Sequence, residues 1–147
     1  MDSSPEVVQR RAELEREAPV AARGMWMRTH LGGSDVVLLC GTIGAEFDVW
    51  QRRLSVTSAA DALLSQQIGL DAVEKVMDEA EEKAKAEVGV EGRKLLPRRS
   101  PGYGDLPLSL SRAIISELDA TRKIGVSITD SDLLVPSKSV TAICEIC

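Results

Sequence analysis

The segment 98–105 holds the residues of this 147-residue chain whose types and spacing best suit the binding of a small ligand. The guanidinium of Arg98 can bind a carboxylate through two parallel hydrogen bonds. Pro101 fixes its own φ angle, and Gly102 allows the backbone to approach a ligand where a Cβ atom would collide. Tyr103, the one tyrosine of the sequence, adds an aromatic face for a cation or a base. Together these residues suit a small zwitterionic ligand.

The same spacing also has a purely structural interpretation. Proline at the second position of a turn and glycine at the third favour a type II β-turn, here at Pro101 and Gly102. Such a turn would only join two elements across a basic surface. Spacing alone favours this turn over a ligand-binding loop.

Three ordered segments strengthen the ligand interpretation, because together they resemble one known family. They are Arg98-x-x-x-Gly102-Tyr103 with Pro101 before the glycine, then residues 125–131, and then residues 136–141. In this order, and at nearly this spacing, they resemble the activation domain of cobalamin-dependent methionine synthase, which binds S-adenosylmethionine. The resemblance is specific over residues 93–143, looser over 40–90 and absent before that.

This resemblance implies a function in reductive reactivation. The chain would bind S-adenosylmethionine and present its methyl group to cob(II)alamin on a separate corrinoid protein, or on a methionine synthase that lacks its own activation domain. Cobalamin is expected on that partner, because the sequence lacks the Asp-x-His-x-x-Gly signature of corrinoid-binding modules. A flavodoxin or ferredoxin would donate the electron. The chain would supply proximity and orientation, as one component of methionine synthase activity that is not catalytic alone.

The resemblance also implies which residues hold the ligand. Arg98 would bind the methionyl carboxylate, and Tyr103 with its glycine neighbours the adenosyl part. The stretch 135–140 would run as extended backbone along the nucleotide-like portion of the ligand. The alternative for this stretch is a strand-entry loop with a solvated lysine. The remaining implied residues are Gly102, Gly104, Pro136, Ser137, Lys138 and Ser139.

Glu74 is the second residue with two interpretations. The resemblance implies that its carboxylate binds the amino group or a hydroxyl of the ligand. The pattern Asp71-x-x-Glu74 also fits a capping box, in which Glu74 would bond backbone amides at the start of a helix. The sequence does not decide between them.

Two other classes of function compete with reactivation. A shortened domain could dock on a corrinoid protein as a scaffold after losing S-adenosylmethionine binding. An ordinary methyltransferase is disfavoured, because no Gly-rich loop follows a strand in the manner of a Rossmann-type fold.

Composition narrows the kinds of partner and the cellular compartment that we expect for the protein. The net charge of −5 and the isoelectric point near 5.0 argue against a nucleic-acid partner. No apolar run approaches the roughly 20 residues that span a bilayer, and no leader is recognised, so we expect a cytoplasmic protein without membrane contact. Three cysteines fit a reducing compartment. Cys144 and Cys147 could supply half of a tetrahedral metal site, but two further ligands are lacking and no metal is expected.

The pattern of elements predicts an α+β fold with helices packed on a twisted, mainly antiparallel sheet, like that of the methionine synthase activation domain. We expect an N-terminal helical extension over 1–24, which packs on the domain or pairs with a partner, and the domain itself over 25–147. A hairpin is expected over 25–31 and 36–40, followed by three helices, the second opened by Ser58-x-x-Asp61 and the third running from Gly69 to Gly89. Strands are expected near 93–96, 125–128, 133–135 and 140–146, and a helix near 108–118.

Overall fold

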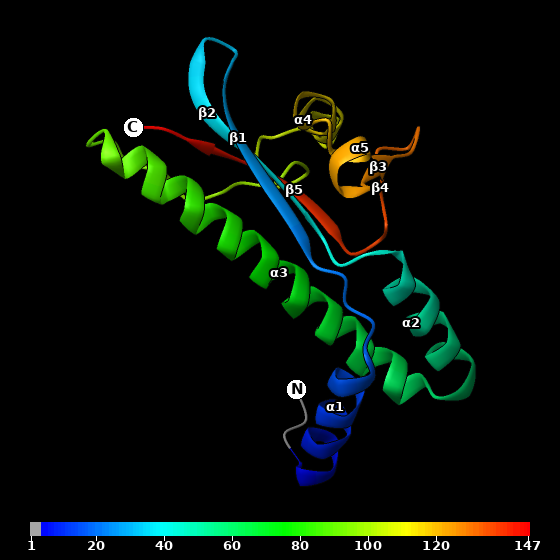
Figure 1. Ribbon diagram of the computed structural model, residues 1–147. Coiled ribbons are helices and arrows are strands. Elements are labelled where there is room, and N and C mark those ends of the chain that lie inside the picture. The colour runs from blue at the N-terminus through cyan, green and yellow to red at the C-terminus, as the bar shows by residue number, and fades with distance from the viewer. Residues whose placement is uncertain (1–3) are drawn as a thin grey trace.

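A three-stranded antiparallel sheet lies at the centre of the computed structural model, which describes residues 4–147 (Figure 1). Its strand order is β1 (Arg23–Leu31), β2 (Ser34–Thr42) and β5 (Ser139–Glu145). The predicted hairpin is confirmed: β1 and β2 are joined by Gly32 and Gly33, which both have positive φ angles. Only glycine adopts such angles readily at both positions of a two-residue hairpin turn. The α+β class is therefore confirmed.

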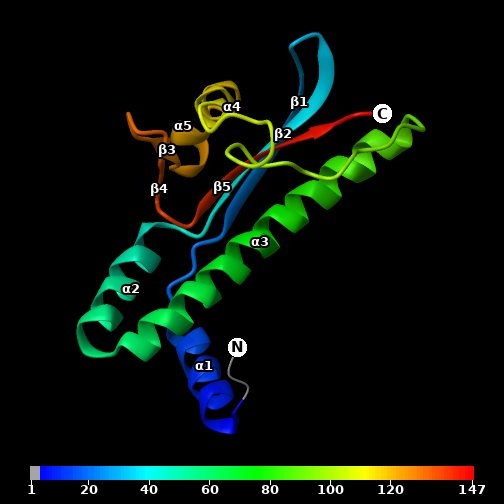
Figure 2. The ribbon, with the colours of Figure 1, turned by 180° about the vertical axis from the view of Figure 1, so that it is seen from behind.

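Helices cover both faces of this sheet (Figures 1 and 2). Alternate residues of β2 point to opposite faces, as the pleat of a strand requires. Val37 and Leu39 pack with residues of α3 (Ala59–Val90). Val36, Leu38 and Cys40 pack with α4 (Leu110–Leu118) and α5 (Ala120–Ile124). Because both faces are buried, this strand is continuously apolar over residues 36–40 rather than alternating.

A third cluster of buried side chains ties the N-terminal helix to the rest of the chain. Leu14 of α1 (Pro5–Glu17) is completely buried, as is Phe47 of α2 (Ala45–Thr57). Both pack with Ile68 and Val73 from the first half of α3. Of the predicted extension over 1–24, the first three residues lie outside the described part of the chain. The helix α1 packs on the domain rather than standing apart from it, and Arg23 and Gly24 already belong to β1 of the central sheet.

The second and third helices predicted after the hairpin form one continuous helix. We expected one helix to open at Ser58 and another to follow Gly69, but α3 runs without a break for 32 residues, about 48 Å at 1.5 Å per residue. The Ser58 cap is confirmed, because its hydroxyl accepts a hydrogen bond from the backbone N–H of Asp61 at 3.1 Å. Gly69 lies inside the helix, where the ring of Phe47 occupies the space a Cβ would need. The helix ends at Val90, one residue beyond the predicted stop at Gly89.

The predicted strand near 93–96 is wrong. The segment 95–99 forms only isolated bridges to the C-terminal segment 143–146, Leu95 with Ile146 and Arg99 with Ile143. Pro97 lies between them and has no N–H group to extend the ladder. The strands expected near 125–128 and 133–135 are shorter, and as β3 (Ser127–Ile128) and β4 (Leu134–Val135) they form a separate two-stranded antiparallel sheet.

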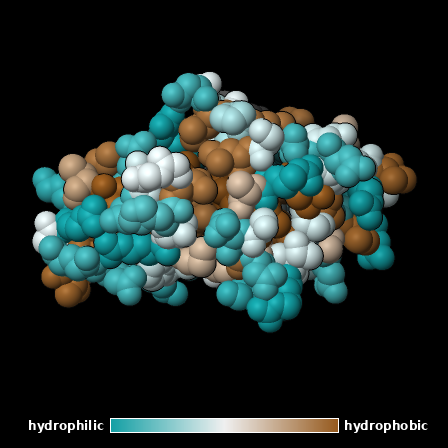
Figure 3. All heavy atoms as spheres, turned by 90° about the horizontal axis from the view of Figure 1, so that it is seen from above, coloured by the Kyte–Doolittle hydropathy of each residue, from teal (hydrophilic) through white to brown (hydrophobic). Residues whose placement is uncertain are grey.

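Figure 3 shows the molecule from above, where apolar residues gather near the middle of the face and hydrophilic residues lie on either side. Within residues 4–147, no helix is both long enough and apolar enough to cross a membrane.

Candidate functional site

A cavity of about 480 Å³ opens between α3, the turn after Arg99, the segment 132–134 and the start of β5. We name it the β5 cavity. It brings together four of the predicted ligand-binding residues, Glu74, Tyr103, Ser137 and Ser139. These come from three segments that are far apart in the sequence. The other five predicted residues are not part of its lining: Arg98, Gly102, Gly104, Pro136 and Lys138.

Arg98 points onto α3, where it meets three carboxylates. Its Nη2 donates to Glu74 at 2.6 Å, and its Nη1 donates to Asp78 at 2.8 Å and to Glu81 at 2.7 Å. The Arg98 side chain is only 18% exposed. Partial burial lowers its pKa, but the carboxylates of Glu81, Asp78 and Glu74 outweigh this and raise the pKa above its ordinary value. The guanidinium is therefore already saturated with acidic partners.

The predicted type II turn is confirmed. The N–H of Tyr103 donates to the carbonyl oxygen of Ser100 at 3.3 Å, and Gly102 at the third position has a φ of 91°. Gly104 also has a positive φ, 61°. This turn directs the Tyr103 side chain toward solvent. Tyr103 is 77% exposed and lies at the rim of the β5 cavity. The turn and the ligand loop are thus compatible interpretations of one segment.

The stretch before β5 is held in place by α2 and β2. Asp48 accepts hydrogen bonds from the backbone N–H of Ser137, at 2.9 Å, and from its hydroxyl. The Ser139 hydroxyl donates to that of Thr42 at 2.8 Å. Pro136, which follows a cis peptide bond, is buried. The backbone along this side of the cavity is fixed by partners outside the cavity.

Lys138 corrects the alternative interpretation of this stretch. We considered it a solvated lysine, but only 8% of its surface is exposed. Its aliphatic chain lies beside Gly69 of α3, and its Nζ is 3.4 Å from Oε1 of Gln51 on α2. The apolar stem of a lysine can pack in this way while its ammonium group reaches a polar partner. Lys138 therefore ties the stretch to α2 and α3 and does not reach the β5 cavity.

Glu74 lies in the middle of α3, so the capping box Asp71-x-x-Glu74 is wrong. A capping glutamate bonds an amide that has no helical partner, and such amides occur only in the first turn. Glu74 is exposed and lines the cavity while it binds Arg98. Asp132, bound to Arg112 at 2.9 Å, also lines the cavity.

Sequence reasoning missed two parts of this site. Asp78 and Glu81, the other partners of Arg98, follow Glu74 at steps of four and three residues, which places all three on one helix face. That spacing was a usable signal. The other part is the buried hydrogen bond between the hydroxyls of Ser111 and Thr141, 3.0 Å apart on the cavity wall. No local pattern links these two residues.

The cysteines differ in their surroundings. Burial raises the pKa of the Cys40 thiol and of the Cys144 thiol to about 12, whereas Cys147 is exposed. Among the residues described, no three His, Cys, Asp or Glu side chains gather into a group that could hold a metal ion.

The β5 cavity thus offers carboxylates, hydroxyls and an exposed aromatic ring to a polar ligand with cationic character. Comparison with protein-family models and with curated proteins finds no match for this chain.

Proposed function

We propose that the β5 cavity binds S-adenosylmethionine and that the protein presents it for the reductive methylation of cob(II)alamin on a separate protein. One observation carries the proposal: a single cavity is lined by four residues that the sequence resemblance assigns to the ligand. These are Glu74, Tyr103, Ser137 and Ser139, and they come from three separate segments of the chain. A volume of about 480 Å³ lies within the range of small-molecule sites.

The chemistry of the lining suits the charges of this ligand. S-adenosylmethionine carries a sulfonium and an ammonium group, and Glu74 and Asp132 supply two carboxylates to the lining of the cavity. The Tyr103 ring offers a face for the adenine or the sulfonium. The hydroxyl oxygens of Ser137 and Ser139 can accept hydrogen bonds from the ribose, since their own hydrogens are donated to Asp48 and Thr42.

Arg98 can bind the ligand only if it gives up one of its present partners. To grip the methionyl carboxylate it must exchange at least the Glu74 partner for the ligand, since its Nη2 now donates to Glu74. Such an exchange would free the Glu74 carboxylate for the ligand's ammonium group. The pair would then open as the ligand binds, and each partner would take the ligand group of opposite charge.

The exposure of the cavity rim fits a site that a partner completes. Leu70, Tyr103, Leu108 and Leu133 all line the cavity and are all exposed, from 46% to 77% of their surface. An apolar rim of this kind suits contact with another protein. That partner would be a corrinoid-binding protein or a methionine synthase lacking this domain, in the cytoplasm, with a flavodoxin or ferredoxin as electron donor. The fold would be that of the methionine synthase activation domain.

Calorimetric titration with S-adenosylmethionine tests the proposal. We expect saturable binding to the wild-type protein, weakened at least tenfold in Glu74→Gln and in Tyr103→Ala. The matched control is Glu82→Gln, which makes the same change at an exposed position on α3 outside the cavity. Circular dichroism establishes that each variant is folded. No heat of binding up to millimolar ligand, or equal binding by all variants, would overturn the proposal.

A second candidate function is supported by the Arg98 cluster. Because Arg98 already has three carboxylate partners, a docking module without S-adenosylmethionine binding needs no exchange of partners. It would bind the corrinoid protein through the apolar rim. Partner binding that is weakened by Leu133→Ala and unaffected by S-adenosylmethionine would favour this function over the first.

A further inference from the structure

The outer edge of β1 is an unusually long and unprotected sheet edge. Within residues 4–147, no strand pairs with the side of β1 that faces away from β2. The strand has nine residues, and its sequence contains no proline and no lysine, the residues that commonly block edge pairing. Every second residue of an edge strand directs its N–H and C=O groups outward. This edge can therefore accept another strand.

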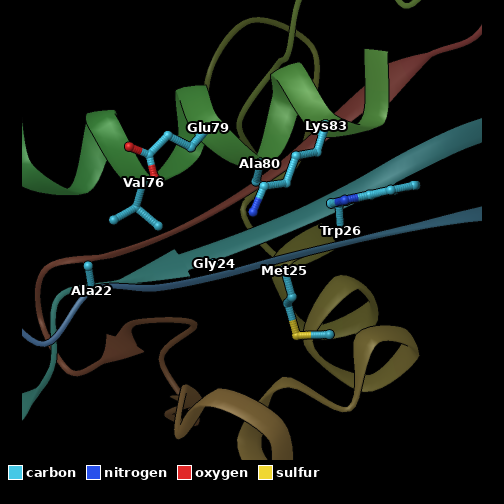
Figure 4. Close-up of a pocket in the computed structure, with 8 residues that line it drawn as sticks. All are labelled: Ala22, Gly24, Met25, Trp26, Val76, Glu79, Ala80 and Lys83. Atoms are coloured by element: carbon cyan, nitrogen blue, oxygen red, sulfur yellow. The ribbon is translucent and has the colours of Figure 1, made fainter. Parts of the chain in front are cut away.

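A groove accompanies this edge on the side of α3 (Figure 4). It has a volume of about 300 Å³ and is lined by Gly24 and Trp26 from β1 and by Val76, Glu79, Ala80 and Lys83 from α3. In Figure 4 the Lys83 side chain extends from the helix toward the strand, while Met25 points to the opposite face. Gly24 has no side chain, and Val76 of α3 occupies the space that a Cβ atom there would need.

The face of α3 along this edge carries one basic residue among acidic ones. Glu79 and Lys83 line the groove, Glu87 lies close enough to raise the pKa of Arg28, and Glu91 forms an ion pair with Arg28. These three α3 residues and the capping residue Glu91 recur every four positions, so they form one exposed stripe. Lys83 and Glu87 carry opposite charges, so when two such helices run antiparallel about an axis between these two residues, Lys83 of each copy lies opposite Glu87 of the other.

We propose that the β1 edge is the interface of a homodimer, in which β1 pairs antiparallel with β1 of a second copy around a two-fold axis at Met27. A two-fold interface uses the same patch on both copies, and an antiparallel strand pair satisfies that requirement directly. With Met27 at the axis, all nine residues of the strand are paired. The two sheets become one six-stranded sheet.

This register places complementary groups opposite each other. Trp26 faces Arg28 of the second copy, and an arginine beside a tryptophan ring gives a favourable cation–π contact. Gly24 faces His30 of the second copy, a residue whose side chain is 71% exposed. The imidazole of His30 then lies beside the groove that Glu79 lines. Arg23 faces Leu31, so no like charges are directly opposed.

The helices also fit this arrangement. α3 packs over both β1 and β2, and strands in a sheet lie about 4.8 Å apart. If each α3 is centred between its own β1 and β2, the two helix axes lie about 10 Å apart across the new strand pair, which is a normal helix packing distance. The two charged stripes then face each other above the junction.

The dimer does not depend on the proposed function. β1 and β5 are opposite edges of the sheet, so pairing through β1 leaves the β5 cavity and its rim exposed. Failure of one proposal therefore says nothing about the other.

Sedimentation equilibrium from low micromolar to submillimolar concentration tests the dimer. We expect the wild-type protein to dimerise and Lys83→Glu, which makes the stripe entirely acidic, to raise the dissociation constant at least tenfold. The control is Lys85→Glu, the same charge change at an exposed position on α3 that does not line the groove. A monomer at every concentration, or equal dissociation constants for the two variants, would overturn the proposal.

Disulfide trapping tests the register, in a Cys147→Ser background that removes the exposed thiol. Met27→Cys places two thiols opposite each other at the axis, and oxidised glutathione should link them into a covalent dimer by accepting two electrons. Thr29→Cys is the control, because its two thiols would lie about 13 Å apart in this register. Equal trapping of both variants, or trapping of neither, would overturn the proposed pairing.

Discussion

The guanidinium of Arg98 and the carboxylate of Glu74 lie 2.6 Å apart, so two residues that the sequence assigns to one ligand bind each other. Asp78 and Glu81 complete the cluster and leave it with an excess of negative charge. The pair joins the segment after Pro97 to the middle of α3. It therefore has a structural role whether or not it also opens to admit a ligand.

Removing Arg98 should destabilise the protein. In Arg98→Ala the three carboxylates face one another without a cation, and we expect a loss of about 1–2 kcal/mol in the free energy of unfolding, since the cluster is only partly buried. Urea denaturation measures this loss. Adding Glu81→Gln to Arg98→Ala should recover part of it, because one repelling charge is removed. Lys75→Ala, at an exposed position on the same helix, should change the midpoint little.

Two glycines in α3 should respond in opposite directions to alanine. Gly89→Ala should stabilise the protein by about 0.5–1 kcal/mol, because a Cβ there meets nothing within 4 Å and alanine favours the helix. Gly69→Ala gains the same preference but places a Cβ 2.7 Å from Cε1 of Phe47. Overpacking typically costs about 1–3 kcal/mol, so we expect a net loss. Thermal melts that shift both variants in the same direction would contradict the close contact with Phe47.

Stability should fall at acid pH partly through the contact between α1 and α3. The side-chain hydrogen bonds from Arg10 lower the pKa of Asp61 below its ordinary value of 3.8, against a smaller effect of desolvation. Because the folded pKa is depressed, the stabilisation is present above pH 3.8 and is lost as the pH falls through the folded pKa. In Asp61→Asn this part of the acid decline should disappear.

Urea midpoints measured between pH 5 and pH 2.5 check this prediction. Asp130→Asn is the control, an exposed aspartate in the turn between β3 and β4. Asp35, whose pKa is lowered mainly by its hydrogen bond from Arg93, should keep some acid dependence in every variant. An Asp61→Asn protein with the full wild-type decline would show that the Arg10 contact does not stabilise the fold.

The sequence predicted those elements of the fold whose signals are local. The hairpin followed from two apolar stretches around Gly32 and Gly33, and the start of α3 from the Ser58 cap. The break at Gly69 was wrong because helix propensity says nothing about Phe47, which packs against that glycine from another helix. The strand near 93–96 was wrong because its apolar residues are next to Pro97, which interrupts the pairing and leaves single bridges at Leu95 and Arg99.

The candidate site was predictable to a similar extent. The type II turn depended on the proline–glycine pair alone and is confirmed. The gathering of Glu74, Tyr103, Ser137 and Ser139 around one cavity needed the resemblance, because contacts between distant segments leave no local pattern. The burial of Lys138 was missed for the same reason, since its partners belong to α2 and α3.

The N-terminal helix should be an energetic part of the domain. Leu14 is completely buried against α2 and α3, and Leu14→Ala should lower the free energy of unfolding by about 2–4 kcal/mol, through lost burial and the cavity left behind. Val8→Ala on the same helix is the control, since Val8 is 58% exposed and its loss should change stability by less than about 0.5 kcal/mol. Equilibrium urea unfolding followed by circular dichroism measures both. If α1 were an independent appendage, the two variants would unfold at the same urea concentration. A single transition that moves only for Leu14→Ala would show that α1 folds together with the sheet.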